Sequence, residues 1–226
     1  MSKLVLFGTG RGAEVAHRFL TADSEHEIVA FTVDGANIKD KHYRGLPVVA
    51  FEEVQHRYPP DRFGMLILLG YQQMNGLRAR KFAEAKAKGY RLESYVASNI
   101  FRVAPIEVGE NCFIMDNQSI SLDVRIGNNV VMWSSNHIGD LSAIADHAWV
   151  SSHVTVAANV NIGERAFLGI GATVSNGVKI GADSFIGARR LVSDDTRAGS
   201  VTLVDQSAEG IDSGTFMRLM MARKKL

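Results

Sequence analysis

The stretch that decides the fold runs from Val108 to Leu191. Divided every six residues it reads VGENCF, IMDNQS, ISLDVR, IGNNVV, MWSSNH, IGDLSA, IADHAW, VSSHVT, VAANVN, IGERAF, LGIGAT, VSNGVK, IGADSF, IGARRL. Every unit opens with Val, Ile, Leu or Met, and a small residue usually follows. A fixed period of this length is typical of a parallel β-helix, in which each unit forms one short strand and a corner, and stacking buries the repeated aliphatic side chain. A sandwich or barrel would show alternation broken by irregular turns instead. The repeat therefore predicts an all-β domain over residues 105–197.

The first hundred residues have a different pattern, in which strands alternate with helices. Short buried strands are expected at residues 3–7, 27–33 and 63–69, and helices at residues 14–20 and 77–88. This order predicts a small parallel sheet with both faces covered. The expected fold is thus α/β + all-β, with a Rossmann-like domain at residues 1–104, a parallel β-helix at 105–197 and a tail at 198–226 that could be partly helical.

Composition excludes several classes of protein. The 226 residues are 46% hydrophobic and 22% charged with a net charge of +1, which gives no reason to expect a nucleic-acid or acidic-membrane partner. The single cysteine, Cys112, excludes an internal disulfide and fits a reducing compartment. No apolar run reaches the roughly 20 residues that span a bilayer, and no signal peptide is evident. We therefore expect a soluble cytoplasmic protein.

A glycine-rich turn follows the first expected strand and opens the first expected helix. It reads Gly8-Thr9-Gly10-Arg11-Gly12, and an acidic residue, Asp34, ends the next strand. Glycines let the backbone approach a phosphate, and a helix N-terminus supplies free N–H groups and a positive dipole. The context fits a dinucleotide fingerprint.

The short domain favours a smaller ligand than NAD. About a hundred residues suffice for one mononucleotide-sized half but not for the paired halves that bind NAD. We therefore favour a nucleotide or a nucleotide-linked sugar, with Arg11 and Arg78 as candidate phosphate contacts. The alternatives are a turn that only serves the backbone, and arginines that are solvated surface charges.

A Gly-rich α/β domain followed by hexads resembles bacterial sugar acyltransferases of the sialic acid O-acetyltransferase and bacillosamine N-acetyltransferase type. The resemblance covers residues 3 to about 195, and its most specific segment is residues 159–174, NVNIGERAFLGIGATV. It implies a left-handed β-helix assembled as a homotrimer, with acetyl-CoA as co-substrate in the groove between neighbouring helices. It also implies a nucleotide-linked sugar on the N-terminal domain, acylated on an amine or hydroxyl in surface-glycan (lipopolysaccharide) biosynthesis. Nucleic-acid, membrane and metal partners are not expected.

Two motifs of that family are changed here. The usual His-(Glu/Asp) pair is replaced by Asp140-Leu141, and a Gly-x-Pro-Ala-Lys-like closing segment is absent from the sequence after Val201. The position of the catalytic base must therefore be found among the other side chains.

Acyl transfer from a thioester needs a base for the acceptor proton, and histidine suits that role near neutral pH. His137 lies three residues before the changed position, and Asn136 and Asp140 flank it as candidate partners of the imidazole. We expect His137 to be the base, at a corner of the helix. His153 is the second candidate, and His147 is expected at the surface. For His137, the alternative is a corner histidine that hydrogen-bonds to backbone between coils.

Candidates for the coenzyme site lie further along the repeat. Trp149 stands where relatives often place a second histidine, and could contact the acyl group or belong to a subunit interface. Small residues that would let pantetheine approach the backbone, and a cation that could meet its phosphates, are Gly169, Gly171, Gly187, Ala188 and Arg189. Glycine at a β-helix corner can equally be a purely structural requirement.

Two other classes of protein remain possible on the same scaffold. A zinc hydrolyase of the γ-carbonic-anhydrase type needs three converging nitrogen ligands, and the spacing of His137, His147 and His153 is unfavourable for that. A non-catalytic nucleotide-sugar-binding scaffold is favoured by the changed His-(Glu/Asp) pair. Within the transferase interpretation we prefer an amine acceptor to a hydroxyl, because an amine needs less help from a base.

Overall fold

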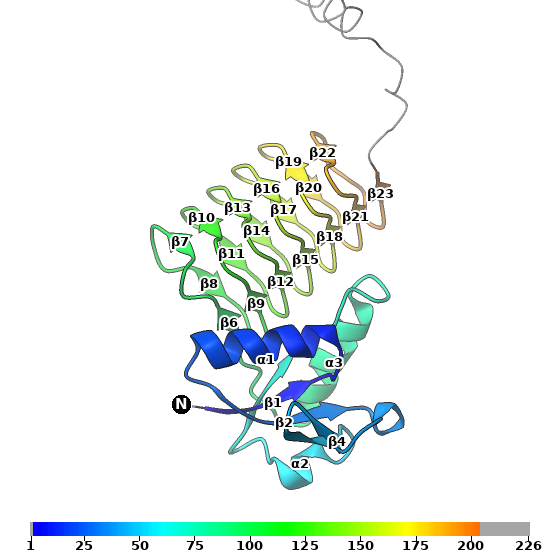
Figure 1. Ribbon diagram of the computed structural model, residues 1–226. Helices are drawn as coiled ribbons and strands as arrows, with labels where there is room; N and C mark the ends of the chain where they lie inside the picture. The colour runs from blue at the N-terminus through cyan, green and yellow to red at the C-terminus, as the bar shows by residue number, and fades with distance from the viewer. Residues whose placement is uncertain (1, 204–226) are drawn as a thin grey trace, which may run out of the picture.

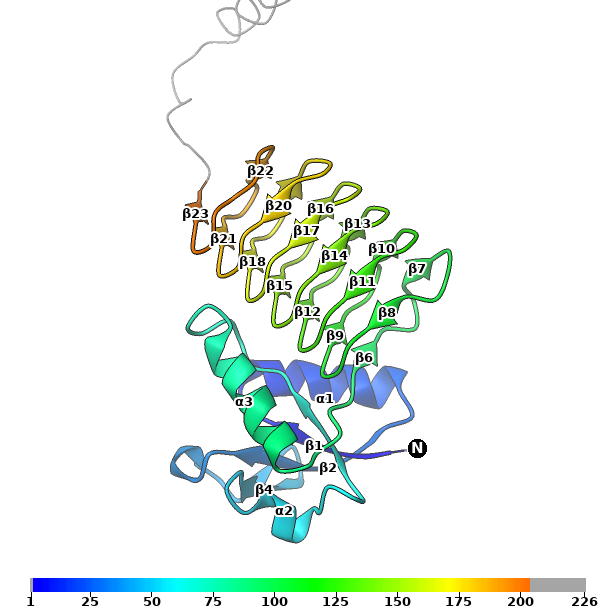
Figure 2. The same ribbon diagram turned by 180° about the vertical axis from the view of Figure 1, so that it is seen from behind.

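The computed structural model describes residues 2–203, in which a small α/β domain is followed by a long parallel β-helix (Figures 1 and 2). The expected helix in the tail at 198–226 lies outside the described residues from residue 204 onward. The α/β domain holds a five-stranded sheet in the order β3-β4-β2-β1-β5. Its strands are β1 (Lys3–Phe7), β2 (Glu27–Val33), β3 (His42–Tyr43), β4 (Leu46–Ala50) and β5 (Gly64–Ile67). All neighbours are parallel except β3 and β4, which form an antiparallel hairpin. The alternation of strands and helices expected from the sequence is present.

Helices cover both faces of this sheet. On one face lies α1 (Arg11–Asp23), whose Leu20 packs with Leu6 and Phe31 of the strands. The other face is covered by α2 (Val54–Arg57) and α3 (Gly76–Ala87), and a short 3-10 helix, η1 (Gly35–Asn37), follows β2. None of the helices within residues 2–203 is long and apolar enough to cross a membrane.

The β-helix has three parallel sheets. The domain-facing sheet contains β6 (Tyr95–Val96), β9 (Phe113–Ile114), β12 (Val131–Met132), β15 (Trp149–Val150), β18 (Phe167–Leu168), β21 (Phe185–Ile186) and β23 (Val201–Thr202). The His137 sheet contains β7 (Phe101–Arg102), β10 (Ser119–Ile120), β13 (His137–Ile138), β16 (Thr155–Val156), β19 (Thr173–Val174) and β22 (Leu191–Val192). The groove sheet contains β8 (Glu107–Val108), β11 (Arg125–Ile126), β14 (Ala143–Ile144), β17 (Asn161–Ile162) and β20 (Lys179–Ile180).

Each coil uses three hexads. Trp149 pairs with Val131 one coil before it and with Phe167 one coil after it, so that equivalent residues stack. The opening aliphatic of each hexad points inward, and Met132 and Ile138 are fully buried. Each such side chain contributes roughly 1.5–3 kcal/mol of hydrophobic stabilisation. The hexad pattern thus correctly predicts a parallel β-helix.

The corners explain the polar residues of the hexads. At each corner one residue has a positive φ, as in Ser135, Leu141 and His147 of a single coil (67°, 59° and 64°). The small residues that follow the strands are explained by packing, because the next coil passes close to them. A Cβ added to Gly163 would lie 2.5 Å from the backbone nitrogen of Ala182. Coiling also extends beyond the hexads, since β6 pairs with β9 before them and β23 with β21 after them.

The two parts of the chain share one core. In both views α1 lies between its own sheet and the β-helix (Figures 1 and 2), and its Phe19 packs edge-on against Tyr95 and Phe113 of the domain-facing sheet. A polar seam runs beside this core. The Asn111 amide bonds to both the N–H and the C=O of Ile67, at 2.8 and 3.0 Å. Because β5 is an edge strand, Asn111 supplies the bonds that a further strand would supply.

Candidate functional site

The glycine-rich turn leaves the N-terminus of α1 open. Gly8 has a φ of 115°, which favours glycine, and its N–H donates to the carbonyl of Thr32. Gly10 precedes α1 and has no side chain to cap it, so the first N–H groups of the helix are free for a ligand. A Cβ on Gly12 would come within 2.5 Å of the Leu68 carbonyl oxygen. The turn therefore allows close helix packing and presents donors to an anion, while the exposed Arg11 forms an ion pair with Glu14.

Asp34 lies at the end of β2 and is bound by a lysine that the sequence analysis did not single out. Lys81 of α3 is buried and donates to Asp34 at 2.6 Å and to Glu84 at 2.7 Å. Burial opposes the charge of Lys81, but hydrogen bonds to the two carboxylates outweigh it, and its pKa lies above the ordinary value. The pair fixes the Asp34 carboxylate and leaves part of it exposed.

Arg78 is fully buried, far from the exposed phosphate contact expected of it. Its guanidinium donates to the carbonyls of His147 and Ala148, at 2.7 and 3.3 Å, and lies over the Trp149 ring. Burial lowers the pKa of Arg78 to about 9. The arginine thus connects α3 to a corner of the β-helix.

Trp149 belongs to the contact between the two parts of the chain. It is 7% exposed, and its ring lies 5.4 Å from Tyr71 and 5.9 Å from Trp133 between centroids. Tyr71 follows β5, is half-exposed and also packs on Phe167 at 4.8 Å. No pattern in the sequence singles out Tyr71, because its partners Trp149 and Phe167 lie about 80 or more residues away.

The candidate base lies on another face. His137 is exposed on β13, in a strand and not at the corner expected for it, and its Nδ1 is 3.4 Å from the Ser119 hydroxyl on the preceding coil. Asn136 is buried and does not orient the imidazole, since its amide donates to the Trp133 carbonyl and accepts from the Val154 N–H. Asp140 accepts from the Leu122 N–H at 3.0 Å.

The other two histidines are at different corners. His153 is exposed at the corner before β16, whose Thr155 stacks on His137. His147 is half-buried against Phe82 of α3, and Asn129 contacts its Nδ1 at 2.8 Å, so the expectation of a surface residue was wrong. Within residues 2–203 no group of three His, Cys, Asp or Glu side chains could hold a metal ion.

The residues expected to contact the coenzyme gather at the corner between the domain-facing and His137 sheets. Gly171 and Arg189 occupy its positive-φ position, at 68° and 57°. A Cβ on Gly169 would meet the nitrogen of Ala188 at 2.6 Å, so coil stacking alone already requires this glycine. A Cβ on Gly187 would meet the Thr202 carbonyl at 3.2 Å.

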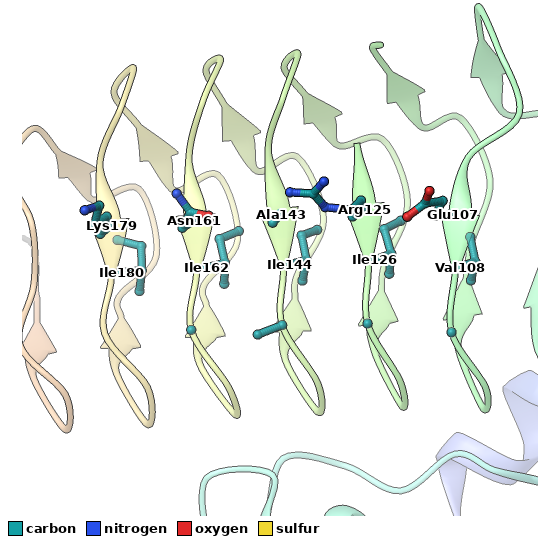
Figure 3. A pocket seen from close by; sticks show the side chains of 14 residues that line it. Glu107, Val108, Arg125, Ile126, Ala143, Ile144, Asn161, Ile162, Lys179 and Ile180 are labelled. Carbon is teal, nitrogen blue, oxygen red and sulfur yellow. The ribbon is translucent and has the colours of Figure 1, made fainter. Parts of the chain in front are cut away.

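An open groove of about 610 Å³ lies on the outer surface of the groove sheet. Figure 3 shows Glu107, Arg125, Ala143, Asn161 and Lys179 in a row along it, one from each coil. None of the predicted site residues lines it, and its described lining holds no histidine or cysteine.

The predicted site is thus divided between opposite sides of the chain. The glycine-rich turn and Asp34 lie on the α/β domain, which packs on the domain-facing sheet, whereas His137 lies on the sheet turned away from that domain (Figure 1). His137 and Ser119 are brought together, as are Asp34 and Lys81. The two groups are not brought together within one chain.

Comparisons with known proteins identify solved structures that share this architecture. No protein-family model matches the chain, and no curated protein matches its sequence. A mutant of perosamine N-acetyltransferase from Caulobacter crescentus, in complex with CoA and GDP-perosamine, is 23% identical with a TM-score of 0.79, over 90% of this chain and 94% of that one. The acetyltransferase domain of PglB from Neisseria gonorrhoeae is 16% identical with a TM-score of 0.77, over 91% and 98%. WeeI from Acinetobacter baumannii is 16% identical with a TM-score of 0.75, over 91% and 98%. The chain therefore has the fold of sugar acetyltransferases built on a hexapeptide-repeat β-helix.

Proposed function

We propose that this protein transfers an acetyl group from acetyl-CoA to an amino group of a nucleotide-linked sugar. The observation that carries the proposal is the combination of an uncapped helix N-terminus after a glycine-rich turn with a hexad β-helix. The fold also matches, over 90% of the chain, the structure of a protein in complex with CoA and GDP-perosamine. A nucleotide-binding role for the α/β domain and a left-handed β-helix are part of the proposal.

The nucleotide-sugar would bind at the carboxyl ends of β1 and β2. Its phosphates would accept from the N–H groups of α1 beside Gly10, and the preorganised Asp34 carboxylate would accept from a ribose hydroxyl. Arg78 has no part in this binding, since its guanidinium is buried against the β-helix.

His137 would act as the general base. The neutral amine attacks the thioester carbonyl carbon, a C–N bond forms, and the C–S bond breaks. The proton lost by nitrogen passes to the imidazole and then to the departing CoA thiolate. Contact of Nδ1 with Ser119 leaves Nε2 free for this transfer.

Direct transfer is favoured over an acyl-cysteine intermediate. Cys112 is fully buried inside the β-helix. Burial raises the pKa of the Cys112 thiol to about 11, so that a thiolate nucleophile is disfavoured at neutral pH. Both substrates therefore bind together in the proposed mechanism.

The division of the site supports an oligomer with active sites between subunits, and we propose that this oligomer is a homotrimer. His137 of one chain can meet a sugar bound on the α/β domain only if that domain belongs to a second copy. Acetyl-CoA would then lie along the corner of Gly169 and Gly171, with Arg189 near its phosphates.

The test is thiol release from acetyl-CoA in the presence of UDP-, dTDP- and GDP-linked amino sugars and their hydroxyl counterparts. Turnover with an amino sugar is the expected result, and turnover only with a hydroxyl sugar would make the protein an O-acetyltransferase. If the chain binds nucleotide-sugar but neither binds acetyl-CoA nor releases thiol, it is a non-catalytic binding scaffold. The replacement of the His-(Glu/Asp) pair by Asp140 and Leu141 would be consistent with that role.

A further inference from the structure

A small hollow lies beside the glycine-rich turn, on the side of the β3–β4 hairpin. Its volume is about 130 Å³, and it is lined by Thr9 of the turn, by Ile38, Lys39 and Asp40 after η1, and by His42, Tyr43 and Val48 of the hairpin. This is about four times the roughly 30 Å³ that one water occupies in the liquid, enough for a heterocyclic ring but not for a whole nucleotide.

The walls of the hollow are held in place by the fold. The Tyr43 ring packs edge-on against the buried Phe31, with centroids 4.9 Å apart. The hairpin turns through Arg44 and Gly45, both at positive φ, and Arg44 forms an ion pair with Glu14 of α1. A ligand would therefore meet a shape that exists before it binds.

The Asp40 carboxylate is the acidic group of this lining, where Lys39 and His42 are side chains that can donate to a carbonyl oxygen of a base. Asp40 is exposed, and within the described part of the chain no hydrogen bond or ion pair engages its side chain. Both of its oxygens can therefore accept hydrogen bonds from a ligand.

We propose that this hollow binds the nucleobase of the nucleotide-linked sugar and that Asp40 selects guanine. The inference rests on the proposed function, which puts the phosphates at the N-terminus of α1. Thr9 belongs both to the turn that precedes α1 and to the lining of the hollow. A nucleotide whose phosphates lie at the turn can therefore place its base in the hollow. Ile38 and Val48 offer apolar contact to the ring.

The choice of base follows from the arrangement of donors on each ring. Guanine presents a ring N–H and an exocyclic amino group side by side, and both can donate to one carboxylate. Uracil and thymine present a single N–H between two carbonyl oxygens, which a carboxylate repels. Adenine and cytosine present an amino group beside a ring nitrogen that only accepts. A base that leaves a polar group facing an unmatched partner is strongly disfavoured.

The experiment is calorimetric titration of the full chain with GDP, UDP, dTDP and ADP. We expect GDP to bind more tightly than each of the others by about ten- to a hundredfold, the range for hydrogen bonds to a charged group. Equal affinities, preference for another base, or no binding of any of the four would overturn the proposal.

Asp40→Asn tests the residue itself. It should reduce the preference for GDP to within about threefold, because an amide can accept only one of the two donors. Asp61→Asn is the matched control, since Asp61 is an exposed aspartate of the same domain outside the hollow. A preference for GDP that survives in Asp40→Asn would remove the role of Asp40.

Binding of acetyl-CoA and thiol release are measured on the same samples. Loss of base preference with acetyl transfer intact overturns only the guanine assignment. Preference for GDP without acetyl-CoA binding supports the nucleobase site and overturns the transferase.

Discussion

The guanidinium of Arg78 donates a 2.7 Å hydrogen bond to the carbonyl oxygen of His147, and this bond joins α3 to a corner of the β-helix. A charge buried in this way is stabilised only by groups that face it, here two carbonyls and the ring of Trp149. The relative placement of the α/β domain and the β-helix therefore depends on this side chain together with the shared apolar core and the amide of Asn111.

Replacement of Arg78 should weaken the whole fold. Arg78→Ala leaves a cavity and a His147 carbonyl without this donor, whereas the Ala148 carbonyl keeps its bond from the Val131 N–H. The change should lower the free energy of unfolding by about 3 kcal/mol. Arg78→Met fills most of the space and should lose less than half of that amount. Urea denaturation measures both, with Arg80→Met as the control, because Arg80 is an exposed residue of the same helix. An Arg78→Ala protein as stable as the control would contradict this role.

The amide of Asn111 makes a further polar contact between the two parts of the chain. Asn111→Ala would leave the N–H and C=O of Ile67 without partners at a buried strand edge, and should cost about 2–4 kcal/mol of unfolding free energy. Asn111 also has a positive φ, which alanine tolerates poorly. Asn159→Ala isolates that effect, because Asn159 has a similar φ of 58° at an exposed corner. Asn159→Ala should lower the free energy of unfolding by only about 1 kcal/mol in the same denaturation experiment.

The burial of His147 predicts a loss of stability in mild acid. Burial lowers the pKa of His147, so its imidazole stays neutral in the folded protein while the unfolded chain, with a pKa near 6.5, takes up a proton. Its contribution to stability is therefore complete above about pH 6.5 and is lost as the pH falls toward the folded-state pKa.

His147→Asn removes the titrating imidazole and preserves the positive-φ backbone of the corner. Asparagine already occupies the equivalent position one coil earlier, at Asn129. The difference in melting temperature between pH 7.5 and pH 5.5 should be smaller in the variant than in the unmodified protein. Equal differences in the two proteins would show that His147 is not the titrating group.

The hexad sequence predicts the β-helix because every unit repeats the same local choice, an aliphatic that points inward and a small residue beneath the next coil. The glycine-rich turn is equally local, and Gly8, Gly10 and Asp34 lie where their order along the chain predicts. The partners of Asp34 and Arg78 could not be predicted in this way. Lys81 and His147 lie 47 and 69 residues away from them, and only the packing of α3 brings each pair together.

Two glycines of the same turn should behave differently on substitution. Gly12→Ala places a methyl group 2.5 Å from the Leu68 carbonyl oxygen and should destabilise the protein by about 1–3 kcal/mol. At Gly10 a Cβ meets no protein atom within 4 Å, so Gly10→Ala should leave the melting temperature nearly unchanged. The methyl group would instead crowd the phosphates at the N-terminus of α1, and nucleotide-sugar affinity measured by calorimetry should fall about tenfold. Unchanged affinity in Gly10→Ala would place the phosphates elsewhere.

The two exposed histidines provide the test of the base. His137→Ala should reduce kcat by about a hundredfold or more, because the acceptor proton then has no base, while acetyl-CoA affinity and melting temperature change little. His153→Ala is the matched control, since His153 is also exposed and lies beside the strand that stacks on His137. Its kcat should remain within about threefold of the unmodified protein. If instead His153→Ala loses activity and His137→Ala retains it, the base is at the corner, and the Ser119 contact serves only the strand. Because His137 lies on a sheet that does not face the α/β domain of its own chain, mixing Gly10→Ala chains with His137→Ala chains adds a second readout. The mixture is assayed at a nucleotide-sugar concentration well below KM, where each variant alone is slow. Activity restored in the mixed oligomer requires that an intact turn and an intact histidine meet from different subunits, whereas a site within one chain predicts no restoration.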